Sequence, residues 1–160
     1  MIVQVKNNND ITIPKLTVHV YYPEGEKAYD FCQTPAGRQI VIPVEKGEGD
    51  LPPAVSADVS VSMNSNEYVD LLPMLNITEN KTNSSYMLTI ANAADRACRK
   101  LSITVLFSDD SGVICALSST APDSIAAGAS TTFTFTLPQS LVDAGAAFTT
   151  ASYTVNEALG

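Results

Sequence analysis

Apolar and polar residues alternate along much of this chain. The alternation is clearest over residues 16–22, 101–107 and 133–137, where mostly Thr, Ser and His occupy the polar positions. A period of two is typical of a β-strand that buries one face. Clusters of Asn, Asp, Gly and Pro lie between these segments, as in turns between short strands. The pattern predicts an all-β protein with antiparallel sheets, and the one helical turn it indicates lies around residues 138–144.

The chain also repeats itself. Asn7 recurs as Asn92, 85 residues later, and the same offset relates Asp10, Lys15, Leu16 and Val20 to Asp95, Lys100, Leu101 and Val105. A second block repeats as well: Gly37 precedes the alternating segment 40–44, and Gly128 precedes the alternating segment 133–137. Preserved order over successive blocks indicates a tandem duplication.

The repeat divides the chain into two units. A last strand is expected to close each unit, over residues 54–63 in the first and 146–156 in the second. We therefore expect two tandem immunoglobulin-like antiparallel β-sandwich domains, residues 1–65 and 66–160. The inward-facing positions predict one core for each, formed by Leu16, Val18, Val20, Ile42 and Val44 in the first and by Leu88, Ile90, Leu101, Ile103, Val105, Phe107, Phe133 and Phe135 in the second.

Both units resemble a known type of module. In the first unit, the run Val5-Lys6-Asn7-Asn8 precedes the alternating segment 16–22. In the second unit, Ile90-Ala91-Asn92 precedes the alternating segment 101–107, and Gly112-Val113-Ile114 and Ile125-Ala126-Ala127-Gly128 follow it. These segments resemble the bacterial FxLYD and CARDB-type immunoglobulin-like modules. The resemblance implies a fold, and such folds carry many functions. The first unit departs from it by having Glu26-Lys27-Ala28 in place of the Gly-Val-Ile step, which leaves its middle strand undefined.

Charge narrows the range of partners. The formal net charge is −8 and the pI about 4.4, without a local cluster of Lys and Arg. Such a chain repels phosphate backbones and anionic lipid, so we expect neither nucleic acid nor a membrane surface as a partner.

Residues 1–20 have neither the basic start nor the apolar stretch of a signal peptide, so we expect synthesis in the cytoplasm without a signal peptide, unless the sequence is a fragment.

The residues needed for catalysis are sparse. His19 is the only histidine, and alternation places it on the outer face of its strand, so a Ser-His-Asp or Cys-His set has no other candidate base. Cys32, Cys98 and Cys115 have no zinc-type spacing and are expected to be free thiols. We expect no enzymatic activity and no cofactor. The only candidate metal ligands are Asp109 and Asp110, and an ordinary hairpin turn explains this pair better because the EF-hand spacing is missing.

The two units differ at their first strand. Residues 68–78 can supply a strand ahead of the second unit, whereas the first unit begins directly on the segment that matches 86–91. The first unit is therefore expected to lack its first strand, which makes Ile2, Val3, Gln4, Val5 and Lys6 the predicted partner-binding edge. The alternative is that residues 45–53 fold back and cover this edge, and the sequence leaves both open.

These observations favour a non-enzymatic structural or interaction protein of a large assembly. A phage virion component, such as a capsid decoration, tail or fibre protein, is the class we expect first. Its partner would be protein, either a second copy or another structural subunit paired through the edge strand. The alternative is a bacterial cell-surface or envelope immunoglobulin-like module that binds protein or glycan, or acts as a spacer.

Overall fold

Antiparallel strands dominate the described chain. The computed structural model describes residues 2–44, 56–64, 66–82, 84–120 and 124–160. Its strands are β1 (Ile2–Lys6), β2 (Ile13–Tyr22), β3 (Gly25–Thr34), β4 (Gln39–Pro43), β5 (Ser56–Ser62), β6 (Leu75–Lys81), β7 (Ser85–Asn92), β8 (Lys100–Asp109), β9 (Gly112–Thr120), β10 (Ser130–Thr136) and β11 (Thr150–Leu159). A 3-10 turn spans Leu72–Met74 and helix α1 spans Gln139–Asp143. The prediction of an all-β protein is confirmed, and α1 lies where the sequence indicates a helical turn.

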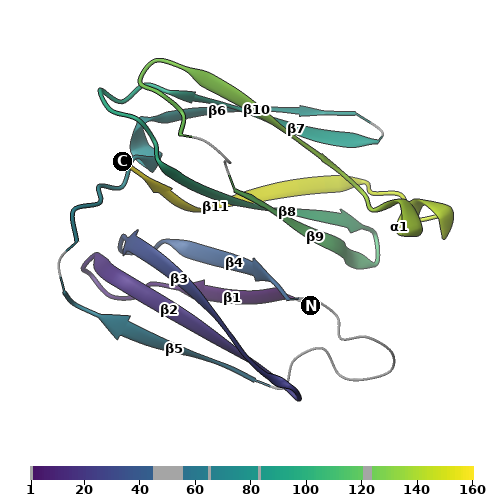
Figure 1. Ribbon diagram of the computed structural model, residues 1–160. Coiled ribbons are helices and arrows are strands. Elements are labelled where there is room, and N and C mark those ends of the chain that lie inside the picture. The colour runs from purple at the N-terminus through teal and green to yellow at the C-terminus, as the bar shows by residue number, and fades with distance from the viewer. Residues whose placement is uncertain (1, 45–55, 65, 83, 121–123) are drawn as a thin grey trace.

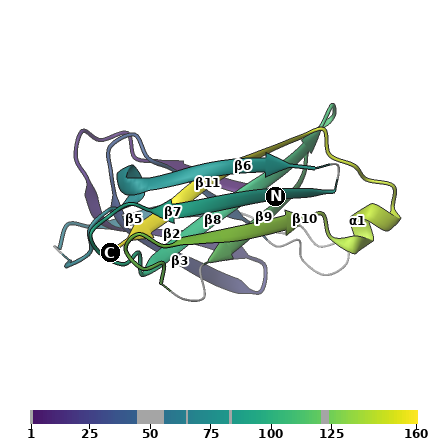
Figure 2. The same cartoon turned by 90° about the horizontal axis from the view of Figure 1, so that it is seen from above.

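The strands form face-to-face sheets in two halves of the molecule (Figure 1). In the first half (residues 2–64), β1-β4 faces β3-β2-β5, and in the second half (residues 66–160), β10-β7-β6 faces β11-β8-β9. All of these pairings are antiparallel. Seen from above, β6, β7 and β10 lie side by side, and α1 lies beyond the end of β10 (Figure 2).

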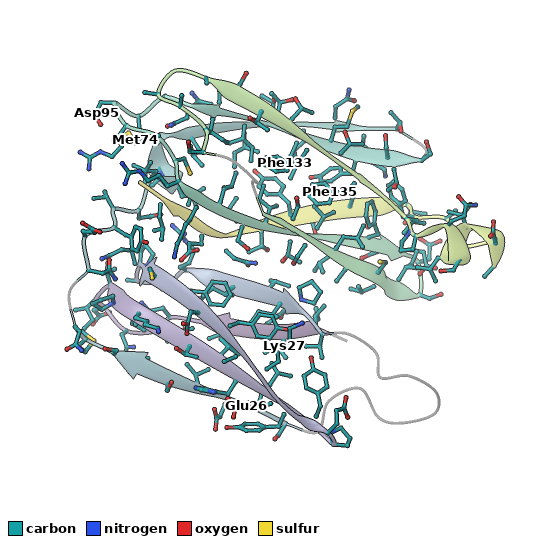
Figure 3. The ribbon with its side chains drawn as sticks, viewed as in Figure 1. Glu26, Lys27, Met74, Asp95, Phe133 and Phe135 are labelled. Atoms are coloured by element: carbon teal, nitrogen blue, oxygen red, sulfur yellow. The ribbon has the colours of Figure 1, made fainter. Side chains whose placement is uncertain are left out.

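Each half has its own cluster of buried apolar side chains, and every residue predicted for a core belongs to one of them. Phe133 and Phe135 extend from β10 toward the facing sheet (Figure 3). The clusters also contain residues that the sequence did not single out, namely Ile13, Phe31 and Ile40 in the first half, and Leu71, Leu75, Tyr86, Cys98, Ile125, Leu137, Phe148, Val155 and Ala158 in the second. Whether the halves are separate domains stays a prediction.

The hydrogen bonds of Asn7 and Asn92 reproduce the sequence repeat in three dimensions. The side-chain Nδ2 of each donates to the carbonyl group four residues along the chain, at 2.9 Å in both cases. The carbonyl group of Asn7 accepts from the Gly37 N–H and that of Asn92 from the Gly128 N–H, both at 2.8 Å. Gly37 and Gly128 have φ angles of 75° and 73°, a left-handed conformation that glycine adopts without strain. The duplicated residues therefore perform the same structural task twice.

Three expectations about strand limits need correction. The middle strand of the first half is well formed, because Gly25 starts β3 as Gly112 starts β9. The first strand of the second half starts at Leu75, since Val69 and Leu71 bond instead to the end of β11. Finally, β11 runs over Thr150–Leu159 and not over residues 146–156, because it pairs with β8 from Ser108 to Lys100, with a β-bulge on the way.

That bulge connects the two halves. It lies between Val155 and Glu157, and the extra residue, Asn156, directs its side chain at β4 of the first half. The Val41 N–H donates to Asn156 Oδ1 at 2.8 Å, and Asn156 Nδ2 donates back to the Val41 carbonyl at 3.0 Å. Thr104 Oγ1 also donates to this carbonyl, at 2.7 Å. The side chains of Asn156 and Thr104 thus bond the backbone of β4 at the edge where a further strand would otherwise pair with it.

Polar contacts at a second location reinforce this junction. Arg38 forms an ion pair with Asp70 at 2.8 Å, with both side chains largely buried. Nearby, Gln33 Nε2 donates to Asn66 Oδ1 at 2.9 Å, and Asn66 Nδ2 donates to the Pro14 carbonyl at 2.7 Å. The two halves are therefore held at more than one point, which restricts their relative motion.

We expect Asn156→Ala to lower the free energy of unfolding by about 1–3 kcal/mol, because the buried Val41 N–H loses its acceptor while its carbonyl keeps Thr104. Urea denaturation of the full chain measures the change. Asn64→Ala is the matched control, since Asn64 is exposed. Equal stability of the two variants would show that the junction contributes little.

Candidate partner-binding edge

The predicted edge residues Ile2, Val3, Gln4, Val5 and Lys6 form β1, and among the described strands β1 pairs only with β4. Val41 uses its backbone groups to bond Asn156, so its register partner Gln4 is not hydrogen-bonded to it. Alternation then places the backbone groups of Val3 and Val5 toward β4. Those of Gln4 and Lys6 point away from β4, to the outer side of β1.

In the second half, the strand that corresponds to β1 has a neighbouring strand at the equivalent edge. β7 corresponds to β1, but it pairs with β10 on one side and β6 on the other. Thr89, the counterpart of Gln4, lies opposite Thr132 of β10 and Thr78 of β6. The position equivalent to β6 holds no described strand in the first half. The alternative that residues 45–53 cover it falls outside the described residues.

The two edges of the β1-β4 sheet thus differ in whether described residues bond their backbone groups. On the β4 side, Asn156 and Thr104 satisfy the Val41 backbone, and both side chains are buried. On the β1 side, Gln4 and Lys6 are exposed. An exposed row of strand N–H and C=O groups is the feature to which another chain can add.

His19 lies on the outer face of β2 within a row of polar side chains. Its Nδ1 contacts the Glu26 carboxylate and its Nε2 lies 3.0 Å from Ser60 Oγ. The hydrogen bond to Glu26 raises the pKa of His19 above its usual value. In the same row, Tyr21 donates to Asp58 at 3.1 Å. Ser60, His19 and Glu26 thus lie in the order of a hydroxyl, a base and an acid, which the sequence did not indicate, and all three contacts are on the exposed side of the sheet.

The other candidate residues form no common site. Cys32, Cys98 and Cys115 are free thiols, and burial raises the pKa of each. Asp109 ends β8 and accepts the Ser111 N–H at 2.7 Å, as in an ordinary turn, with Asp110 next to it. Within the described ranges, no group of three or more His, Cys, Asp or Glu side chains is arranged to hold a metal ion.

A cavity of about 510 Å³ lies at the junction of the halves, and sequence reasoning did not find it. It is lined by Tyr29 and Phe31 from β3 and by Asn156 and Glu157 from β11, among others. Glu157 accepts the Cys32 N–H at 2.7 Å. Burial raises the pKa of Glu157, and this effect outweighs the opposite one of the Cys32 N–H and of the Lys100 charge. The sequence carries no signal for this site, because Glu157 is buried by packing between the halves.

No protein-family model matches the chain, and the curated proteins contain no match either. None of the helices in the described ranges is both long enough and apolar enough to cross a membrane.

Glu157 should make stability depend on pH. Because its pKa is raised in the folded chain, the unfolded chain ionises first as pH rises above the ordinary value of 4.5, so stability falls with rising pH from there to the folded pKa. Glu157→Gln keeps an acceptor for Cys32 and should be more stable than the parent at pH 7 but not at pH 3.5. Urea denaturation at both pH values tests this, with the exposed Glu24→Gln as control. A gain of equal size at both pH values would contradict the assignment.

Proposed function

We propose that this chain is a non-enzymatic structural protein that binds another polypeptide through the outer edge of β1. The single observation that carries the proposal is the unequal pairing of two equivalent strands. β7 has a partner on both sides, whereas among the described strands β1 has one on the β4 side only. One acid, base and hydroxyl are in contact among the described residues, namely Glu26, His19 and Ser60, but they lie on the exposed face of the β3-β2-β5 sheet, where water competes for their hydrogen bonds, and this setting does not favour catalysis.

The junction between the halves supports a structural role that depends on fixed geometry. A spacer gains reach from flexible connections, whereas the buried bonds of Val41 with Asn156 and the Arg38–Asp70 ion pair hold the halves together. A body with fixed geometry and an open edge at β1 is suited to assembly. We propose a phage virion as the first candidate assembly. We propose the bacterial cell surface as the second, because immunoglobulin-like modules of the FxLYD and CARDB type are the fold-level resemblance of the sequence.

Hydrogen exchange tests the open edge directly. In a demonstrated monomer, the amides of Gln4 and Lys6 should exchange roughly tenfold faster or more than those of Thr89 and Ala91, their counterparts beside β6. In the assembled state, the amides of Gln4 and Lys6 should become protected. Strong protection of Gln4 and Lys6 in the monomer would show that the edge is already covered and would overturn the proposal.

Proline substitutions separate edge blocking from unfolding. Gln4→Pro removes an N–H that points away from β4, so the fold should persist, with a loss of about 1 kcal/mol or less, while assembly is lost. Val5→Pro removes an N–H that bonds β4, so it should cost about 3 kcal/mol or more. Urea denaturation and light scattering measure both variants. Normal assembly by Gln4→Pro would exclude β1 as the binding edge.

A further inference from the structure

Two valines on β5 have no cover although they face the core side of their sheet. Val59 lies opposite Val18 and Val61 opposite Leu16, and both of these β2 residues are buried. Side chains directly opposite each other on neighbouring strands share a face of the sheet. Nevertheless, Val59 is 45% exposed and Val61 57% exposed.

In the second half, the equivalent positions are buried. Val155 and Ala158 of β11 lie opposite Ile103 and Leu101, the counterparts of Val18 and Leu16, and they are only 5% and 0% exposed. Strand β6 of the facing sheet contributes Leu75 and Ile77 to the same core cluster. The first half has no described strand in the place of β6, so no described residue fills the place beside β1 and above β5.

The open backbone edge and the exposed valines border the same place in the first half. We call this place the acceptor slot, and it consists of the outer edge of β1 together with Val59 and Val61 of β5. It lies away from the second half, because β3 and β4 are the strands that contact β11, whereas β5 lies on the far side of the first half (Figure 1). The junction therefore leaves the acceptor slot accessible among the described residues.

Charge indicates which kind of strand fits. Lys6 is the only charged side chain of β1, and it has no ion pair with a described residue. In β6, the residue at the corresponding register position is Asn76, opposite Ala91. A donor strand with an acidic residue there would pair with Lys6 across the strands.

A second copy of the chain satisfies these requirements less well. Antiparallel pairing of two β1 strands about Gln4 places Lys6 opposite Ile2, so Lys6 gains no acidic partner. It also brings together two bodies that each carry a net charge of −8.

We propose that the acceptor slot takes one extended strand from another polypeptide, antiparallel to β1. Its apolar side chains alternate, as Leu75 and Ile77 do in β6, and cover Val59 and Val61, while an acidic residue lies opposite Lys6. The inference rests on the proposed function and specifies its partner as a strand-forming segment of a different chain.

A peptide based on β6 is the probe. It has the sequence of residues 73–82 with Asp in place of Asn76, and it is added to the full chain. We expect saturable binding that shifts the NMR signals of the Val59 and Val61 methyl groups and protects the Gln4 and Lys6 amides. A peptide in which Ser replaces both Leu75 and Ile77 should not bind. One with Lys in place of Asn76 should bind roughly two- to fivefold more weakly than the Asp peptide.

Variants of the chain test the valines. Val59→Ser and Val61→Ser should each weaken peptide binding about tenfold or more, because the peptide then buries less apolar surface. Val142→Ser is the matched control, since Val142 is an exposed valine on α1. A chain with residues 69–84 placed directly ahead of Met1 repeats the test within one molecule, where the high local concentration compensates for weak binding. This chain should melt at a higher temperature than one carrying the Ser-substituted segment.

The outcomes separate this inference from the function on which it rests. Rapid exchange at Gln4 with no effect of either the peptide or the fused segment overturns the inference and leaves the open edge intact. A dimer that Gln4→Pro dissolves would make a second copy the occupant and would also overturn it. Protection of Gln4 in the free monomer overturns both proposals.

Discussion

The pairing of the Val41 backbone with the Asn156 side-chain amide determines how the molecule is arranged. A primary amide presents a donor and an acceptor side by side, so it can replace the neighbouring strand that β4 lacks. The Thr104 hydroxyl donates to the same carbonyl, so it is the acceptor toward Asn156 Nδ2 and toward the Ser118 hydroxyl. Because these groups are buried, losing one partner would leave another unsatisfied, and the halves are held in one orientation.

This arrangement closes one edge of the first half and leaves the opposite edge open. Strand edges are normally paired, covered or protected by charge because unsatisfied backbone groups invite other chains. Here the junction pairs β4 with side chains of β8 and β11, while β1 has only Lys6 as a protecting charge. The described β1-β4 sheet thus has one open edge, and it lies at the side away from the second half.

Much of the fold could be predicted because its signals are local. The period of two identified the strands and their buried faces, and the 85-residue repeat placed Asn7 and Asn92 in equivalent positions. The Asn156 bulge could not be predicted, because a shift of one residue is meaningful only against the register of β8. Likewise, the burial of Glu157 arises from packing between the halves and leaves no pattern along the chain.

The sequence of β5 indicates whether its exposed valines are suited to contact with water or to being covered by another strand. Strand β5 reads Ser-Ala-Asp-Val-Ser-Val-Ser, with its apolar residues on the side of Leu16 and Val18 and its polar residues on the other. A strand that faces water on both sides has no reason to keep this alternation, since a Thr or Ser at either valine position would preserve β propensity without exposing apolar surface. The alternation is instead that of a strand with one buried face. The pattern on β5 therefore supports the proposal that a further strand completes this sandwich.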